Sequence, residues 1–210
     1  GCNKLQAGLG NLVSAIKYFK NNMVDLRIAL VSAITAMTGA WIGTKIIFLL
    51  PEESIQKAIT VALPVIALIM VLRKTDARNV IMRSEISKKT VVQALIVGVI
   101  MGFYNSLFGP GIGTVAIIAF TMIMHYDARC ASGNGKVLIV LTNAIALVSY
   151  VKTGNVAYEI ACPAAICAIA GNLVGVNLAI RKGEKIIKPV MLVVVILTVI
   201  KFAWQNHLWG

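Results

Sequence analysis

The sequence predicts an all-α polytopic membrane protein built from two inverted repeats of transmembrane helices that contain broken or re-entrant segments. Of the 210 residues, 59% are hydrophobic and only 13% are charged, whereas a soluble domain carries about 25% charged residues. Several apolar stretches approach the roughly 20 residues that cross a bilayer. Because these stretches are continuous instead of alternating, they disfavour a transmembrane barrel. We expect one transmembrane domain, residues 1–210.

The second half of the chain repeats the first half at a shift of 132 positions. Within 11–43, 11 of the 33 positions are identical to their counterparts without a gap, among them Asn11 on Asn143, Tyr18 on Tyr150, Gly39 on Gly171 and Gly43 on Gly175. An internal duplication in a hydrophobic chain is typical of membrane proteins organised about a pseudo-two-fold axis.

Repeat A, residues 1–72, is predicted to hold three apolar segments. Residues 5–19 form a helix, 28–50 form a full span closed by Pro51, and 56–72 form a shorter span with a kink at Pro64. The polar stretch 73–89, with six basic and two acidic residues, is the linker between the repeats.

Repeat B, residues 90–208, resumes the apolar pattern. Segments 91–108 and 114–125 flank a break at GPGIG (109–113), and three further spans follow at 133–151, 157–180 and 188–204. The two segments beside the break are short for full spans, so we expect half-helices that meet near mid-membrane. The first half has no counterpart of 91–131. If both repeats are complete, roughly 40 residues are therefore missing before Gly1, and the first repeat is N-terminally truncated.

Basic loops indicate which ends of the spans are cytoplasmic. The linker 73–89, loop 20–27 and the basic loop 181–188 should lie inside, and the acid-leaning loop 51–57 outside. Loop 181–188 is nevertheless the repeat counterpart of 51–57, with Glu184 on Glu52. Corresponding loops on opposite sides predict that the two repeats are inverted relative to each other.

Lys4 and Lys136 occupy equivalent positions in the two repeats, each at the start of an apolar helix. A charged group in the membrane costs about 3 kcal/mol or more and usually marks a transport pathway. The alternative is that both side chains snorkel to an interface. A pair that met near the axis would form a cationic site for a small anion.

The break itself carries a second candidate site. Glycines such as Gly109 and Gly111 allow close backbone approach, and Pro110 ends the preceding helix. A half-helix that starts after the break would direct N–H groups at an anion. The alternative is a tight turn between antiparallel helices. Asn105 lies just before the break and Asn134 just before Lys136. Each side chain either lines a cavity or forms hydrogen bonds between helices. The same two alternatives hold for Asn11 and Asn143.

Composition excludes several classes of function. The net charge is +12, but no basic run alternates with aromatic residues as single-strand nucleic-acid binders require. The four cysteines form no metal or disulfide pattern. The spans hold no carboxylate deep within them, which argues against cation transport. An enzyme would need a carboxylate pair, a metal cluster or a nucleophile beside a base, and none is evident.

Several runs resemble the sulfite exporter TauE/SafE family, closest to its branch of bacterial probable membrane transporter proteins: NKLQ (3–6), YF (18–19), GFYNSLFGPGIGT (102–114), Lys136 and TN (142–143). The resemblance covers nearly the whole chain, but a glycine-rich segment that precedes NKLQ in the family is missing. It implies transport of sulfite, sulfonates or related small anions across a bacterial inner membrane. The positions that match the family motifs are Asn3, Lys4, Gln6, Gly109, Pro110, Gly111 and Lys136.

We therefore expect a multi-pass secondary transporter of a small, sulfur-containing anion that alternates access around a mid-membrane site between the repeats. Lys4 and Lys136 would supply charge, the break would supply backbone donors, and Asn105 and Asn134 would orient the substrate. The alternatives are a non-transporting membrane scaffold or subunit and a passive anion channel. The expected partners are the anion and the lipid bilayer, with no nucleic acid and no cofactor; the oligomeric state is open.

Overall fold

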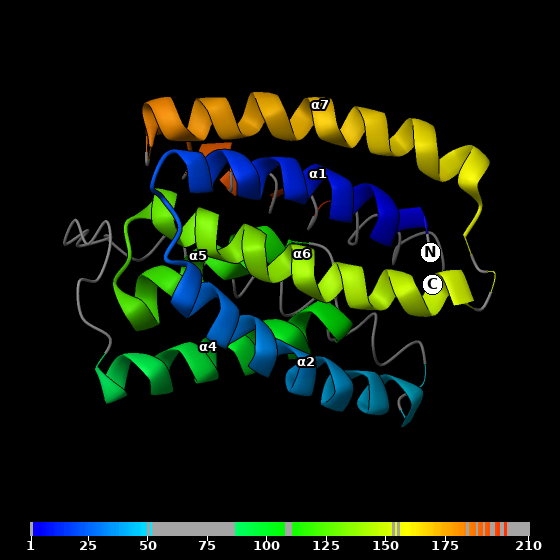
Figure 1. Ribbon diagram of the computed structural model, residues 1–210, viewed down its shortest axis with the longest axis horizontal. Helices are drawn as coiled ribbons and strands as arrows, with labels where there is room; N and C mark the ends of the chain where they lie inside the picture. Colours follow the sequence, from blue (N-terminus) through cyan, green and yellow to red (C-terminus); the bar gives the residue numbers. More distant parts are fainter. Residues whose placement is uncertain are drawn as a thin grey trace.

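The computed structural model of the chain describes residues 2–49, 51, 87–107, 111–152, 154, 156–183 and, beyond these, 185–187, 189–190, 192–193, 196–197 and 200. Its helices are α1 (Cys2–Lys20), α2 (Leu26–Leu49), α4 (Lys88–Leu107), α5 (Ile112–Met124), α6 (Ala128–Lys152) and α7 (Tyr158–Lys182), shown in Figure 1. The predicted span 56–72, its kink at Pro64, almost all of the linker 73–89 and much of 188–204 lie outside the described residues.

The described part of the chain is helical, and four of its helices are long and apolar enough to cross a membrane, namely α2, α4, α6 and α7. This confirms the prediction of an all-α polytopic membrane protein. Helix α5, with 13 residues, is about 20 Å long and is too short to cross the roughly 30 Å hydrocarbon core.

The predicted start of one span was wrong. Helix α6 begins at Ala128, five residues before the predicted position 133, because Asp127 caps it. The Asp127 carboxylate accepts a hydrogen bond from the Arg129 N–H at 3.1 Å. The backbone carbonyl of Asp127 accepts a hydrogen bond from the Ala131 N–H at 2.8 Å. The polar and glycine-rich stretch 127–135 resembles a loop in composition, but the cap and the surrounding helices hold it in a helix.

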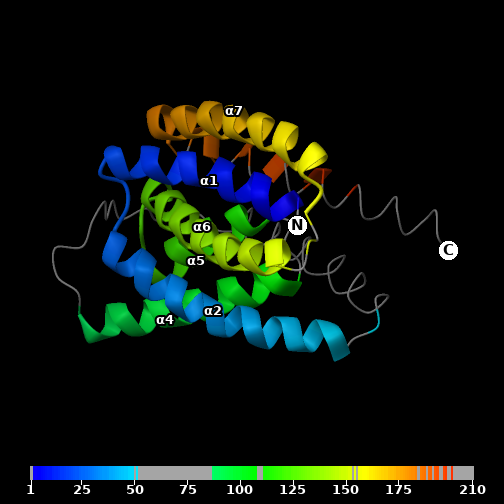
Figure 2. The ribbon, with the colours of Figure 1, turned by 45° about the vertical axis from the view of Figure 1, so that its right-hand side comes forward.

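Helices α1 and α6 run in opposite directions. Gly8 lies beside Asn143, Asn11 is hydrogen-bonded to Lys136, and Tyr18 is hydrogen-bonded to Ser132. Later residues of α1 therefore contact earlier residues of α6. Helices α2 and α7 also run in opposite directions, as Figures 1 and 2 show. In the numbering of the duplication, α1 corresponds to α6 and α2 to α7.

Helices α2 and α4 run parallel and pack closely through glycines. A methyl group at Gly102 would collide with the Ala36 carbonyl, and one at Gly39 would collide with the Val99 carbonyl. The backbones can approach this closely only because these positions carry no side chain. Ser106 adds a hydrogen bond from its Oγ to the Ala40 carbonyl at 2.9 Å.

Helices α4 and α5 form an antiparallel hairpin on either side of the break. Gln93 near the start of α4 donates from Nε2 to the Ile123 carbonyl at 2.7 Å near the end of α5. At the other end of α4, Asn105 lies beside Thr142, with 3.4 Å between Nδ2 and Oγ1. Thr142 is ten residues before the end of α6, so Asn105, near the end of α4, lies about 15 Å short of that end.

One end of the bundle collects most of the basic residues of the described helices. The last turns of α1 and α7 and the first turns of α2, α4 and α6 lie at this end, at the left of Figure 1. It carries Lys17, Lys20, Arg27, Lys88, Lys89, Arg129, Arg181 and Lys182. The opposite end holds the first turn of α1, with Lys4, the last turn of α2, which has no basic residue, and the last residue of α6, Lys152.

Candidate functional site: a lysine held by amide oxygens

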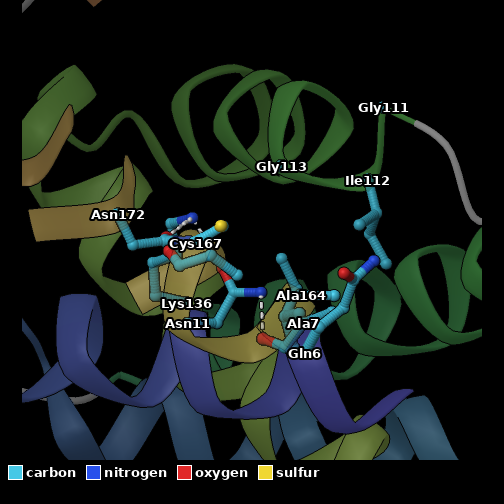
Figure 3. A pocket seen from close by; sticks show the side chains of 12 residues that line it. Gln6, Ala7, Asn11, Gly111, Ile112, Gly113, Lys136, Ala164, Cys167 and Asn172 are labelled. Carbon is cyan, nitrogen blue, oxygen red and sulfur yellow. Dashed lines mark hydrogen bonds between the residues drawn. The ribbon is translucent and has the colours of Figure 1, made fainter. Parts of the chain in front are cut away.

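The Lys136 ammonium group lies between α1, α6 and α7 and is held by two neutral oxygens. It donates to the Asn11 Oδ1 at 2.6 Å and to the Asn172 Oδ1 at 3.2 Å. Figure 3 shows the three side chains turned toward one another across the cavity. Amide oxygens can accept hydrogen bonds from an ammonium group, but they do not neutralise its charge.

A second hydrogen-bond layer fixes Asn172 in this orientation. The Ser14 Oγ donates to the Asn172 Oδ1 at 2.9 Å, and the Asn172 Nδ2 donates to the Ala168 carbonyl at 2.8 Å. Asn11 is fixed in the same way, because its Nδ2 donates to the Ala7 carbonyl at 2.7 Å. Each amide therefore uses its nitrogen on its own helix and presents its oxygen to Lys136.

The lysine borders a cavity of about 640 Å³. Four segments contribute its walls: α1, the start of α5, α6 and α7 (Figure 3). The lining residues are Gln6, Ala7, Asn11, Gly111, Ile112, Gly113, Lys136, Ile139, Ala164, Cys167, Ala168 and Asn172. Among these residues Lys136 alone carries a full charge, so the field within the cavity is positive.

The first turn of α5 opens onto the same cavity. Gly111 caps the helix with φ 75°, a left-handed conformation that favours glycine. Its carbonyl accepts the N–H groups of Thr114 at 2.8 Å and Val115 at 3.1 Å. The earliest N–H groups of a helix have no intrahelical acceptor and carry the positive end of the helix dipole. Here they lie on the side of the cavity that Gly111, Ile112 and Gly113 form.

The structure brings together three of the nine residues proposed from the sequence: Gln6, Gly111 and Lys136 line the one cavity. Lys4 does not line it. Lys4 is half-buried and lies seven residues before Asn11 on α1, about 10 Å along the helix axis. Gly109 and Pro110 lie outside the described residues.

The three remaining candidates, all asparagines, make other contacts. Asn3 is exposed and accepts a hydrogen bond from Gln6 at 3.1 Å within α1. Asn105 bridges α4 and α6 through Thr142. Asn134 is fully buried and accepts the Asp25 N–H at 2.8 Å. Asn105 and Asn134 therefore form hydrogen bonds between segments of the chain, which is the structural one of the two alternatives that the sequence left open.

Sequence reasoning missed Asn172 and Ser14. The signal for Asn172 was present, because an amide directly follows Gly171 in an apolar helix where the first repeat has Ala40 after Gly39. It also missed the buried carboxylate of Asp25, 7% exposed, which accepts the Tyr126 hydroxyl at 2.9 Å. Asp25 directly precedes α2 and looked like an ordinary loop residue.

Comparison with known proteins assigns the chain to a family. The family model described as "Sulfite exporter TauE/SafE" matches residues 1–202. The chain belongs to this family. TauE/SafE proteins are membrane transporters, so the apolar helices described above belong to a multi-pass membrane protein of a transporter family.

The curated TauE/SafE relatives that match are bacterial proteins with transporter names. "Probable membrane transporter protein ORF9" of Sinorhizobium sp is 27% identical over 96% of this chain and 76% of its own length. "Probable membrane transporter protein YfcA" of Escherichia coli K12 is 22% identical over 98% of this chain and 75% of its own. A "Probable membrane transporter protein" of Haemophilus influenzae is 22% identical, with 98% and 80% covered. No solved structure matches.

Proposed function

We propose that the protein is a secondary transporter of a small anion in the bacterial inner membrane, with the Lys136 cavity as its substrate site. The anion is sulfite, an organosulfonate or a related sulfur-containing anion. The family supports the transporter class, and its description, "Sulfite exporter TauE/SafE", supports the choice of sulfur oxyanions. The cavity geometry supports the position of the site.

One observation carries the proposal: a lysine in the described bundle is surrounded by neutral acceptors in a cavity without a lining carboxylate. An ammonium group away from bulk water is costly and gains most from an anionic partner. A bound sulfite would accept hydrogen bonds from Lys136 and from the first N–H groups of α5, because charge-assisted hydrogen bonds are stronger than neutral ones. Asn11 and Asn172 would hold the ammonium group while the site is empty.

The arrangement of the helices around the cavity is compatible with an alternating-access mechanism. We infer that the two halves are inverted repeats, with a first repeat, 1–72, a cytoplasmic linker, 73–89, and a second repeat, 90–208. The opposite directions of α1 and α6, and of α2 and α7, support this inference. The hairpin α4–α5, in which Asn105 near the end of α4 lies beside Thr142 within α6, supports a re-entrant segment at mid-membrane. Rocking of one repeat against the other would expose the site to each side in turn.

The test is uptake of labelled sulfite by vesicles that contain the full-length protein, with Lys136→Met compared with the wild type. Lys152→Met is the matched control, because Lys152 is exposed in the last turn of the same helix. We expect Lys136→Met to abolish saturable uptake and Lys152→Met to leave it unchanged. Equal uptake by all three proteins would remove Lys136 from the mechanism.

Counterflow separates this proposal from its two alternatives. A carrier preloaded with unlabelled sulfite accumulates labelled sulfite transiently, whereas a passive anion channel only equilibrates it. A non-transporting scaffold or subunit would give neither signal above protein-free vesicles. We expect transient accumulation that saturates with sulfite concentration.

A further inference from the structure

We propose that Tyr18 and Ser132 form the cytoplasmic gate of the transporter, and that the anion passes between these two side chains on its way between Lys136 and the cytoplasm. The gate is closed in this structure. This assignment rests on the proposed function, because it takes the Lys136 cavity as the substrate site and the basic end of the bundle as the cytoplasmic end.

The large cavity beside Lys136 extends away from the basic end. Along α1 it reaches Ala7, about one turn before Asn11, and along α7 it reaches Ala164, about two turns before Asn172. Both helices run toward the basic end, where their last turns lie (Figure 1). The cavity of about 640 Å³ therefore lies between Lys136 and the opposite end of the bundle.

Two smaller cavities continue from Lys136 toward the basic end. One, of about 260 Å³, is lined by Ser14 and Tyr18 as well as by Lys136. The other, of about 190 Å³, is lined by Thr114 and Ser132 as well as by Lys136. Each therefore joins the lysine to two hydroxyl groups, which can donate hydrogen bonds to an anion without holding it by charge.

The Tyr18–Ser132 pair lies where these two cavities end. Tyr18 is the lining residue of α1 closest to the basic end, and Ser132 is the lining residue of α6 closest to it. The two side chains are hydrogen-bonded to each other, and both are buried, at 2% and 8% exposure. Ser132 lies one turn from Lys136 on the same face of α6, so the pair closes the polar path one turn beyond the lysine.

An apolar cluster lies beyond the pair, at the basic end. It joins the end of α1, the first turns of α2 and α6, and α7, and its buried members are Tyr18, Val24, Ala29, Ala128, Val176, Ala179 and Ile187. A packed apolar constriction excludes water and stops ions. Tyr18 belongs both to this cluster and to the polar path, so its movement would open both.

Arg129 places a second positive charge on the far side of the gate. It lies one turn before Ser132 on α6, and its charge acts on the Tyr18 hydroxyl. Its guanidinium packs against the end of α7, where a Cβ added at Gly183 would lie 2.6 Å from the Arg129 Nε. Lys136 and Arg129 thus lie on either side of the gate, about 10 Å apart along α6, and each favours an anion on its own side.

The experiment measures how fast a thiol behind the gate reacts from the cytoplasmic side. Ser14→Cys introduces the thiol beside the cavity that Tyr18 and Lys136 line, in a full-length protein whose only other cysteine is the buried Cys130. Inside-out membrane vesicles expose the cytoplasmic face to an impermeant methanethiosulfonate reagent that carries a sulfonate group. Peptide mass spectrometry follows the reaction at positions 14 and 130.

With the gate intact, the thiol at position 14 should react slowly. Tyr18→Phe and Ser132→Ala each remove the hydrogen bond and should raise the rate by about two- to tenfold, which is the net effect of one such bond on an equilibrium. The two together should raise the rate no further than the larger single effect, because they remove the same bond. Tyr150→Phe, at the exposed repeat counterpart of Tyr18, should change nothing. Cys130 should stay unreacted throughout, which shows that each variant is folded.

Equal rates with and without Tyr18→Phe or Ser132→Ala would overturn the gate. So would fast reaction at position 14 before either substitution, or fully additive effects of the two. Uptake of labelled sulfite by the same vesicles tests the proposed function separately. Lys136-dependent uptake with equal reaction rates would overturn the gate alone. The expected rates without any sulfite uptake would support the gate and overturn sulfite as the anion.

Discussion

At the scale of single residues, the proposed binding of an anion depends on how Lys136 is paired. A lysine with a carboxylate partner would be a structural ion pair with little residual field. Here its described partners are Asn11 and Asn172, whose oxygens orient the ammonium group without neutralising it. The charge remains available to an anion that enters the cavity.

The first prediction concerns Asn172→Asp, which changes one amide group to a carboxylate. The new carboxylate would lie at the Asn172 position, 3.2 Å from the Lys136 ammonium in the present geometry, and would compete with any anion. We expect sulfite affinity to fall by about tenfold or more, measured by equilibrium binding to the purified protein. Asn172→Leu, which adds no charge, should weaken binding less. Equal effects of the two substitutions would contradict the role given to charge.

The residues of the site were predictable only where the sequence itself singles them out. Lys136 stood out because a charge in an apolar helix is costly and because the repeat places a lysine at its counterpart. Its partners Asn11 and Asn172 could not be assigned, because the contact depends on how α1 and α7 pack on α6. Lys4 shows the same limit, since repeat equivalence alone does not decide which side chains share a cavity.

At the scale of the elements, glycine placement decides which helices touch. The duplicated pair of glycines is present on α2 and α7, but only the α2 copy is covered within the described residues. The sequence shows that the pair is duplicated, and the structure adds which copy is in use within the described residues. The sequence also predicted a break at 109–113, and the structure shows α4 and the short α5 antiparallel to each other, with Asn105 near the end of α4 beside Thr142 in the middle of α6.

The second prediction compares Gly39→Ala with Gly171→Ala in the chain 1–210. A methyl group at Gly39 meets the Val99 carbonyl, so overpacking should destabilise the protein by about 1–3 kcal/mol. At Gly171 the methyl group meets nothing within 4 Å, so stability should hold or rise slightly with helix propensity. Unfolding in detergent mixtures, followed by circular dichroism, measures both. Equal losses would show that the two faces are in the same environment.

At the scale of the whole molecule, the gathering of basic residues at one end sets the orientation. Cytoplasmic loops of membrane proteins are enriched in lysine and arginine. The end that carries the connections α1–α2 and α5–α6 and the C-terminus of α7 is basic, and we infer that it faces the cytoplasm. This agrees with the loops that the sequence assigned to the inside. Loop charge led to the prediction that the repeats are inverted, but it could not predict the angles and contacts between helices, because apolar faces of similar composition can pack in many ways.

The third prediction concerns this orientation. Single cysteines replace Asn21, Lys182, Pro51 or Gly154 in a protein whose native cysteines are serine. An impermeant maleimide added to intact cells should label positions 51 and 154 and spare 21 and 182, because the two pairs lie at opposite ends of the bundle (Figure 1). Permeabilised cells provide the control, in which all four should react. Labelling of 21 or 182 in intact cells would contradict the orientation.

The most direct measurement is equilibrium binding of sulfite to the purified full-length protein, by titration calorimetry, for the wild type and Lys136→Met. We expect saturable binding to the wild type and a loss of affinity of about tenfold or more in the variant, with chloride as a weakly competing control anion. Undiminished binding by a well-folded Lys136→Met protein would contradict the claim that this lysine forms the anion site.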